Sequence, residues 1–175
     1  VTLSEDSLKG AWLFMSPKDK GGLGCVACHS GSFFTDEKFH NVGFPQIGRG
    51  KRADGRDFGR WQVTKKEEDR YAFRTPGLIN IETGAPYGHS GTFQTMDDLL
   101  VYHANPGKYY SQFDYSLRGL VQFIDGSKVY QNAYLFTQEA INSGNLSSQL
   151  LHRDLTASEL VYLKSFISDL TDKCL

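Results

Sequence analysis

The stretch that decides the fold of this chain is Cys25-Val26-Ala27-Cys28-His29. Two cysteines separated by two residues and followed at once by a histidine form the attachment pattern of a c-type haem. The two thiols can reach the two vinyl groups of one porphyrin, and the adjacent imidazole then faces the iron. The pattern therefore predicts one covalent haem, with Cys25 and Cys28 as its thioethers and His29 as the fifth ligand of the iron.

Two other interpretations of the cysteine pair are weaker. Half of a zinc site would need a second Cys or His pair at matching spacing, and the third cysteine, Cys174, stands alone near the end of the sequence. A thioredoxin-like redox pair would need a βαβ context and would make no use of His29. Cys174 could be a free thiol or form an intermolecular bridge, and we expect it to be a bystander.

The chain has 175 residues and a formal net charge of −1. This length predicts one domain over residues 1–175, large enough to bury a core and a macrocycle. A charge near zero gives no argument for nucleic acid or an acidic membrane, and no stretch approaches the roughly 18 apolar residues of a membrane span. Val1 opens directly into a polar segment, so we expect no signal peptide in this sequence. Because haem of this type is attached after export, we expect a periplasmic protein.

A first helix is expected to begin at the polar residues 4–7 and to end before Pro17, because proline disfavours a helical residue before it. Its apolar positions recur at helical spacing. They are Leu8, Ala11, Trp12 and Met15.

A second helix is expected to begin at Thr95, which can cap it together with Asp98 at the N3 position. It should end at the Asn-Pro-Gly run of residues 105–107. One face carries residues at i, i+3, i+4 and i+7. They are Met96, Leu99, Leu100 and His103.

A third helix is expected around residues 128–142, and the last helix begins with a capping box made of Thr156 and Glu159. We expect the last helix to cross the first. Its apolar stripe consists of Leu160, Leu163, Ile167 and Leu170.

Residues 30–74 carry little periodic pattern and are expected to form long loops with short turns. Loops of this length normally count against an assignment, but a haem supplies apolar surface that they can cover. The predicted fold class is therefore mainly α: a class I cytochrome c-like helical domain wrapped around one covalent haem, with long loops.

Several blocks of the sequence resemble the C-terminal haem domain of the bacterial di-haem cytochrome c peroxidase and MauG family. The most specific are an F-R-T-P-G-L block at residues 73–78 and an A-P-Y-G-H-S-G block at residues 85–91. The haem motif, residues 33–43 and the closing helix also fit. The resemblance covers most of the chain and leaves about residues 110–150 as a poorly matched insertion.

The resemblance implies two haems in two cytochrome-like domains of the full family member. Peroxide reacts at the N-terminal haem, and the C-terminal haem takes electrons from an outside donor. This chain resembles the second half, so its partner would be a redox protein or a second haem domain. The resemblance also implies a calcium ion held by the backbone carbonyls of Gly84 and Pro86. Ile79 stands where many relatives have arginine, which leaves Arg74 as the candidate for a haem propionate.

The iron ligand opposite His29 could come from any of six residues: His103, His89, Met96, His40, Tyr102 and Tyr87. Two arguments favour His103. It lies on an apolar helix face that has no other use for an imidazole, and a buried neutral imidazole needs partners for its nitrogens. By resemblance, it also falls where the family places a methionine ligand, or a tyrosine in MauG-like members.

The other five residues have alternative roles. Met96 has a suitable separation from His29 but stands in the first turn of its helix, where a core position is the simpler hypothesis. His40 is expected to be structural, and Tyr87 and Tyr102 to be packing residues. By resemblance, His89 lines the distal side without binding iron. An open or water-bound iron also remains an alternative.

Three functions fit these residues. The first is an electron-transfer module with His29 and His103 as axial ligands. The second is a peroxidase or MauG-like oxidase acting at this haem, with His89 as the distal acid–base group. The third is a fragment of a larger di-haem peroxidase. Nothing in the sequence predicts the oligomeric state.

Overall fold

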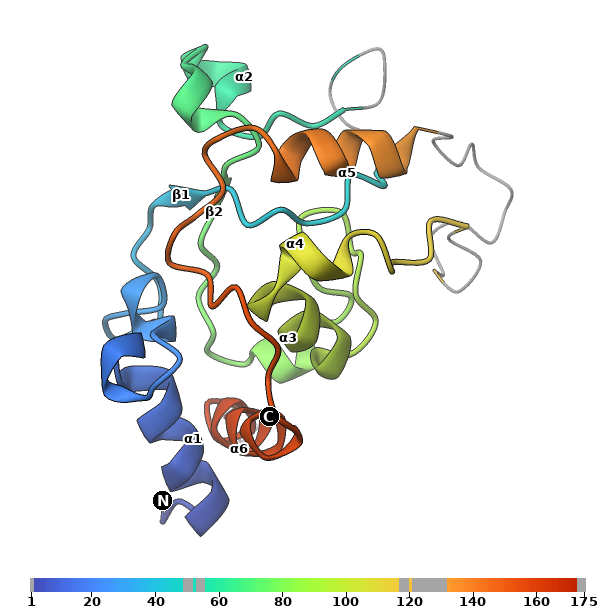
Figure 1. Ribbon diagram of the computed structural model, residues 1–175. Helices are drawn as coiled ribbons and strands as arrows, with labels where there is room; N and C mark the ends of the chain where they lie inside the picture. The colour runs from blue at the N-terminus through green and yellow to red at the C-terminus, as the bar shows by residue number, and fades with distance from the viewer. Residues whose placement is uncertain (1, 49–51, 53–55, 117–119, 121–131, 173–175) are drawn as a thin grey trace.

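The computed structural model describes residues 2–48, 52, 56–116, 120 and 132–172. This part of the chain is mainly helical, with one small antiparallel pair of strands (Figure 1). Its strands are β1 (Phe39–His40) and β2 (Phe73–Arg74). Its helices are α1 (Glu5–Met15), α2 (Trp61–Thr64), α3 (Met96–Ala104), α4 (Pro106–Tyr109), α5 (Ala133–Ile141) and α6 (Ala157–Ser168).

Helix α1 has the expected span but not the expected face. The Ser4 hydroxyl caps it by accepting from the backbone N–H of Ser7, and the helix ends at Met15, before Pro17. Three of the four apolar residues that share the expected face are exposed: Leu8 is 56% exposed, Trp12 54% and Met15 44%. The apolar face read from the spacing is therefore not the buried face of the helix. The buried face consists of Ser7, Gly10, Leu13 and Phe14.

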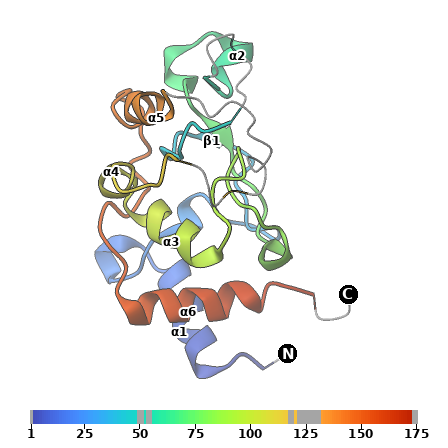
Figure 2. The same cartoon turned by 90° about the vertical axis from the view of Figure 1, so that its right-hand side faces the viewer.

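Gly10 explains why α1 turns this other face inward. A Cβ atom built at Gly10 would lie 1.9 Å from the carbonyl oxygen of Tyr162 in α6, so the two backbones meet where there is no side chain. Only glycine permits so close an approach. The expected crossing of the first and last helices is confirmed, and Figure 2 shows α6 lying across α1.

Helix α6 contributes buried side chains to the hydrophobic core at this crossing. The predicted capping box is present: Thr156 accepts from the N–H of Glu159, whose carboxylate accepts from the N–H of Thr156. Leu163 and Ile167 of the expected stripe are buried. Phe166, which the stripe did not include, is buried as well and joins Leu13, Phe14, Leu23 and Leu163 in one cluster, against which Cys25 and Phe34 also pack.

Helices α3 and α4 form the middle of the structure (Figure 1). Thr95 caps α3 as predicted, accepting from the N–H of Asp98. Helix α3 ends at Ala104, and Pro106 begins the short helix α4. Tyr87, Phe93 and Tyr102 are the buried residues of a second cluster, against which Met96 and Leu99 pack.

The β1–β2 pair and α5 lie beyond α3 and α4, on the side away from α1 and α6 (Figure 1). Phe39 pairs with Arg74 and His40 with Phe73. The expected helix around residues 128–142 is observed as α5, and residues 128–131 lie outside the described part of the chain, as does Cys174. The expected insertion at 110–150 is described only in part. Within the described residues, no helix is long and apolar enough to cross a membrane.

The crossing at Gly10 can be tested by adding one methyl group. Gly10→Ala would place a Cβ against the backbone of Tyr162, so α1 and α6 must separate. We expect the free energy of unfolding to fall by about 1–3 kcal/mol, the usual cost of overpacking. Urea denaturation followed by circular dichroism measures it. Gly107→Ala is the control, because a Cβ at Gly107 meets no atom within 4 Å. Equal losses in both variants would show that the crossing is not the cause.

Candidate haem-binding site

One tight turn carries both cysteines and His29. The 3₁₀ turn η2 (Cys25–Ala27) follows Gly24, which adopts φ 71°, a left-handed conformation suited to glycine. The backbone N–H groups of Cys28 and His29 both donate to the carbonyl oxygen of Cys25, at 3.2 and 2.9 Å. The turn therefore fixes the three side chains relative to one another. Neither cysteine forms a disulfide within the described part of the chain.

Burial disfavours the thiolate form of both cysteines in this turn. Burial raises the pKa of Cys25 to about 12 and also raises the pKa of Cys28. Zinc ligands and redox-active cysteines need the thiolate form, which a lowered pKa favours. The environment thus argues against the redox-active interpretation of the pair, which needs a thiolate without the help of a metal ion. Cys28 does lie near Asp36 and His40, and the potential ligand atoms of these three residues are within 4.8 Å of one another. A metal site made of these three residues would, however, leave Cys25 and His29 without a role.

His29 is oriented by the backbone. Its Nδ1 lies 3.1 Å from the carbonyl oxygen of Phe34, and because a carbonyl can only accept, Nδ1 carries the proton. This tautomer leaves Nε2 unprotonated, as a metal ligand requires. The backbone of Pro76 also lies within hydrogen-bonding reach of the ring. Burial lowers the pKa of His29, which keeps the imidazole neutral. The ring also lies 6.3 Å from the ring of Phe14, in the core beside α6.

His103 has one buried nitrogen, Nδ1, without a hydrogen-bond partner in the described residues. Burial lowers the pKa of His103 to about 4, and repulsion from the charged form of His29 contributes to this shift. The two imidazoles therefore lie close enough to sense each other's charge. The ring of Phe44 lies edge-on to His103, with 5.5 Å between ring centroids.

His89 lies in a turn between Gly88 and Gly91, which adopt φ values of 87° and 66°. Its ring stacks on Phe73 at 3.8 Å, with an angle of 15° between the planes. Part of the residue is exposed to solvent. Neighbouring protein atoms still desolvate the ring, which lowers the pKa of His89 to about 4. His89 is therefore neutral at pH 7.

Gln46 is a neighbour of His89 that the sequence did not single out. It is 3% exposed, and its Nε2 lies 3.4 Å from Nε2 of His89. An amide NH₂ can only donate, so Nε2 of His89 accepts. The Oε1 atom of Gln46 accepts from the N–H of Asp57 at 3.3 Å. Gln46 stands in a loop without periodicity, so no sequence pattern would have revealed it.

The remaining ligand candidates have protein partners. Nε2 of His40 lies 2.8 Å from Oδ2 of Asp36. The hydroxyl of Tyr87 donates to Glu82 O and that of Tyr102 to Gly43 O, both at 2.9 Å. Met96 packs on the aromatic cluster around Tyr87 and Tyr102. These contacts fit the structural roles expected of them.

The residues expected to bind a propionate and calcium lie at the surface. Arg74 forms an ion pair with Glu37 at 2.9 Å, and its side chain is 54% exposed. Gly84 and Pro86 are exposed and follow the 3₁₀ turn η4 (Ile81–Thr83). Their ligand roles stay predictions.

Comparison with known proteins identifies relatives by sequence. No protein-family model matches the chain. It is 31% identical over 126 residues to the cytochrome-c peroxidase IdrP1 of Denitromonas iodatirespirans, a match covering 59% of this chain and 32% of that protein. It is 33% identical over 103 residues to the methylamine utilization protein MauG of Methylophilus methylotrophus, covering 58% of this chain and 27% of MauG. It is also 33% identical to the cytochrome c peroxidase Ccp of Escherichia coli, a match covering 56% of this chain and 20% of that protein.

Solved structures share the fold. A MauG-like protein associated with microbial copper homeostasis matches with a TM-score of 0.66 and 24% identity, over 99% of this chain and 45% of that one. The diheme peroxidase BthA from Burkholderia thailandensis matches with a TM-score of 0.63 and 20% identity, over 99% and 44%.

These matches agree with the family resemblance found in the sequence. They span about a third or less of each curated relative named above and less than half of each solved structure. The chain is thus a relative of the di-haem cytochrome c peroxidases and MauG, and it matches only one part of the length of those proteins.

Proposed function

We propose that this chain is a c-type haem electron-transfer domain, corresponding to the C-terminal half of a di-haem cytochrome c peroxidase. In this proposal residues 1–175 form one class I cytochrome c-like domain, exported to the periplasm. It passes single electrons between an outside donor and a second redox centre, either a partner protein or a second haem domain. The haem, when bound, supplies the one-electron couple.

The unpartnered Nδ1 of His103 carries this proposal. A buried nitrogen without a hydrogen bond costs about 1–3 kcal/mol, and iron bound at Nδ1 of His103 would remove that cost. His29 would bind through Nε2, because Phe34 already holds its Nδ1. The pKa of each histidine is lowered, so each offers a neutral nitrogen at pH 7.

Two filled axial positions favour electron transfer over chemistry on peroxide. An iron with a side chain on both faces has no position open to a substrate. Met96, His40, Tyr87 and Tyr102 are engaged elsewhere, so they do not compete with His103. The proposal also keeps Arg74 for a propionate and Gly84 and Pro86 for a calcium ion.

The rival function is a peroxidase or MauG-like oxidase acting at this site. One observation favours it: His89 is neutral, held by Phe73 and Gln46, and therefore able to take a proton. A third possibility, that the chain is one piece of a larger di-haem peroxidase, makes both functions true of the whole protein.

Covalent attachment is the first prediction. Protein produced in an export host with cytochrome c maturation should keep its colour through acid–acetone extraction, and its intact mass should exceed the chain by one haem. The reason is the fixed turn that holds Cys25 and Cys28 beside His29. A Cys25→Ala, Cys28→Ala variant should release all haem into the organic layer. Loss of haem from the unaltered protein would contradict the attachment.

The identity of the sixth ligand is the second prediction. His103→Met should keep the iron low-spin and raise the reduction potential, because a thioether favours ferrous iron more than an imidazole does. His103→Gly should give a high-spin ferric spectrum. Optical spectra of the ferric and ferrous forms and a redox titration measure both effects.

His89→Gly is the matched control for His103→Gly, since it removes the other imidazole whose pKa is lowered to about 4. We expect His89→Gly to keep the low-spin spectrum. If the His103 variants keep the spectrum of the unaltered protein and the His89 variant loses it, His89 is the ligand instead.

Weak peroxidase activity is the third prediction. With both axial positions filled, turnover of peroxide with a reduced cytochrome donor should stay below about 1 s⁻¹, the lower edge of ordinary enzyme rates. His103→Gly should raise it, and His89→Gly should not. Faster turnover by the unaltered chain would favour the rival function.

A further inference from the structure

The segment between α5 and α6 contacts both parts of the haem site proposed above. We call residues 146–155 of this segment the strap. In Figure 1 the strap passes between the turns that carry the haem motif and helices α3 and α4. Leu146 forms a β-bridge with Asn41, and Leu155 packs against the hydrophobic cluster at the crossing of α1 and α6. The strap is therefore fixed to the rest of the fold at both of its ends.

Lys18 connects the strap to the loop of the haem motif. Its ammonium group donates to the carbonyl oxygens of residues 148–150, at 3.0, 3.4 and 3.0 Å. A lysine has three N–H donors, so one side chain can serve all three carbonyls. The stem of Lys18 lies against Gly24, since a Cβ there would be 3.3 Å from Cγ of Lys18. Gly24 directly precedes Cys25, so the strap is tied to the turn that holds both cysteines and His29.

The N–H of His152 fixes the strap to the end of α3. It donates to the carbonyl oxygen of Ala104 at 2.8 Å, and Ala104 directly follows His103. On the side chain of His152, Nε2 lies 3.1 Å from the carbonyl oxygen of Ser147. His152 adopts φ 56°, a left-handed conformation that costs a non-glycine residue about 1–3 kcal/mol and persists only where surrounding contacts impose it. These contacts therefore hold the strap in a conformation that it would not adopt alone.

Asp154 fixes the strap to the start of α4. Its carboxylate accepts from Nδ2 of Asn105 at 3.0 Å and forms an ion pair with Lys108. The hydrogen bond from Lys108 lowers the pKa of Asp154, so this carboxylate is ionised at pH 7. Asn105 is the residue between α3 and α4, so Asp154 holds the same corner of the structure as His152.

Very little chain separates these contacts. One residue, Leu151, lies between the last carbonyl that Lys18 contacts and the N–H that donates to Ala104. Consecutive Cα atoms are about 3.8 Å apart, so this stretch has little slack. Leu151 also packs against the same hydrophobic cluster as Leu100 of α3. The end of α3 can therefore move away from the haem-motif loop only if contacts of the strap break.

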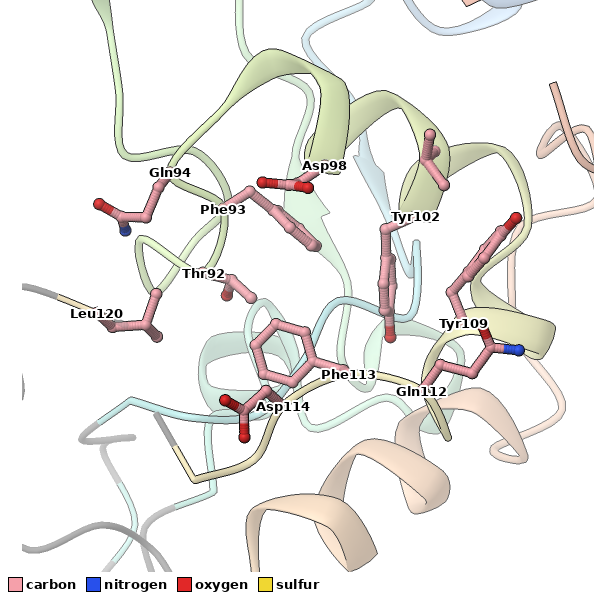
Figure 3. A pocket seen from close by; sticks show the side chains of 11 residues that line it. Thr92, Phe93, Gln94, Asp98, Tyr102, Tyr109, Gln112, Phe113, Asp114 and Leu120 are labelled. Carbon is pink, nitrogen blue, oxygen red and sulfur yellow. The ribbon is translucent and has the colours of Figure 1, made fainter. Parts of the chain in front are cut away.

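The strap contacts α3 and α4 outside the pocket that these helices line. Tyr102 and Tyr109 line this pocket of about 420 Å³ (Figure 3), whereas Ala104, Asn105 and Lys108 do not. The residues that hold the strap are thus distinct from those around the pocket. The strap supports the end of α3 separately.

We propose that Lys18 and the strap form a clamp that keeps His103 on the iron. The clamp has this role only if His103 is the sixth ligand, as proposed above. If the end of α3 moves away from the loop that carries His29, His103 is drawn off the iron, and the clamp resists this movement. Lys18 is a positioning residue, because it acts on His103 through the strap. It sets how often the sixth position opens to small ligands and to peroxide.

Cyanide measures how often His103 leaves the ferric iron of the haem-loaded protein, because cyanide can bind only at a free axial position. At saturating cyanide, the rate of the change in the optical spectrum equals the rate at which His103 dissociates. Lys18→Met keeps the stem of the side chain and removes the ammonium group. We expect this limiting rate to rise by about fivefold or more, the effect of one typical hydrogen bond on a rate. Lys18→Arg, which restores a cationic donor, should reverse most of the rise.

Lys20→Met is the matched control. Lys20 belongs to the same 3₁₀ turn, η1 (Lys18–Lys20), and its replacement removes the same charge without changing the three carbonyl contacts. We expect its limiting rate to equal that of the unaltered protein. An unchanged rate in Lys18→Met, or an equal rise in both lysine variants, would overturn the proposal. Circular dichroism should show every variant folded.

Asp154→Ala tests whether the contacts act as one device, because it breaks the contacts of the strap with Asn105 and Lys108. In a clamp, opening either end releases α3. The double variant Lys18→Met, Asp154→Ala should therefore exceed the faster single variant by no more than about twofold, whereas independent distant sites would multiply their effects on the rate. Multiplied effects would show two separate structural contributions and no clamp.

Hydrogen exchange gives a measurement that does not involve the iron. In Lys18→Met, the amides of the strap and of the end of α3 should exchange faster than in the unaltered protein, while those of the α1–α6 crossing should not. Unchanged exchange in the strap would contradict the clamp.

Failure of the clamp and failure of the proposed function give different results. A high-spin ferric spectrum, with cyanide binding equally fast in all variants, would refute His103 as the ligand and the clamp with it. A low-spin spectrum with an unchanged limiting rate in Lys18→Met would refute the clamp alone.

Discussion

The backbone contact between Gly10 and Tyr162 is the constraint on which the rest of the structure depends. Without a side chain at Gly10, α1 and α6 lie close enough for the rings of Phe14 and Phe166 to meet at 5.3 Å. Both rings contact Phe34, at 5.9 and 6.1 Å. The carbonyl oxygen of Phe34 in turn holds Nδ1 of His29. A missing side chain in the first helix thus helps to orient an imidazole in the haem motif.

The histidines of the structure differ in how their nitrogens are satisfied. His29 has a backbone acceptor, and His89 has an amide donor at the long distance of 3.4 Å. The buried Nδ1 of His103 has no partner in the described residues, although the pKa values of His89 and His103 are lowered equally, to about 4. Desolvation makes every one of these rings neutral, so protonation state does not separate them. The difference lies in hydrogen bonding, and it points to His103 as the ring that needs a ligand.

The sequence predicted what depends on neighbouring residues and failed where distant residues decide. The caps of α3 and α6 each involve two residues three positions apart, so Thr95 and Thr156 marked both helix starts. The span of α1 was predicted, but its buried face was not. Periodicity counts apolar side chains, whereas Gly10 acts by having none. Two other features also depend on residues far apart in the sequence and were not predicted. They are the β1–β2 pair, in which Phe39 pairs with Arg74, and the contact of Gln46 with His89.

The orientation of His103 shows how a local pattern and a distant contact combine. Helical period alone places His103 on the face with Met96 and Leu99. The rotation of α3 is then fixed from outside, because Gly43 O accepts from the Tyr102 hydroxyl and Phe44 lies edge-on to His103. Gly43 itself has φ 65° and is so close to α5 that a Cβ there would lie 2.3 Å from Cδ1 of Ile141. The packing of α5 against Gly43 therefore contributes to the placement of α3, although no periodicity links those two helices.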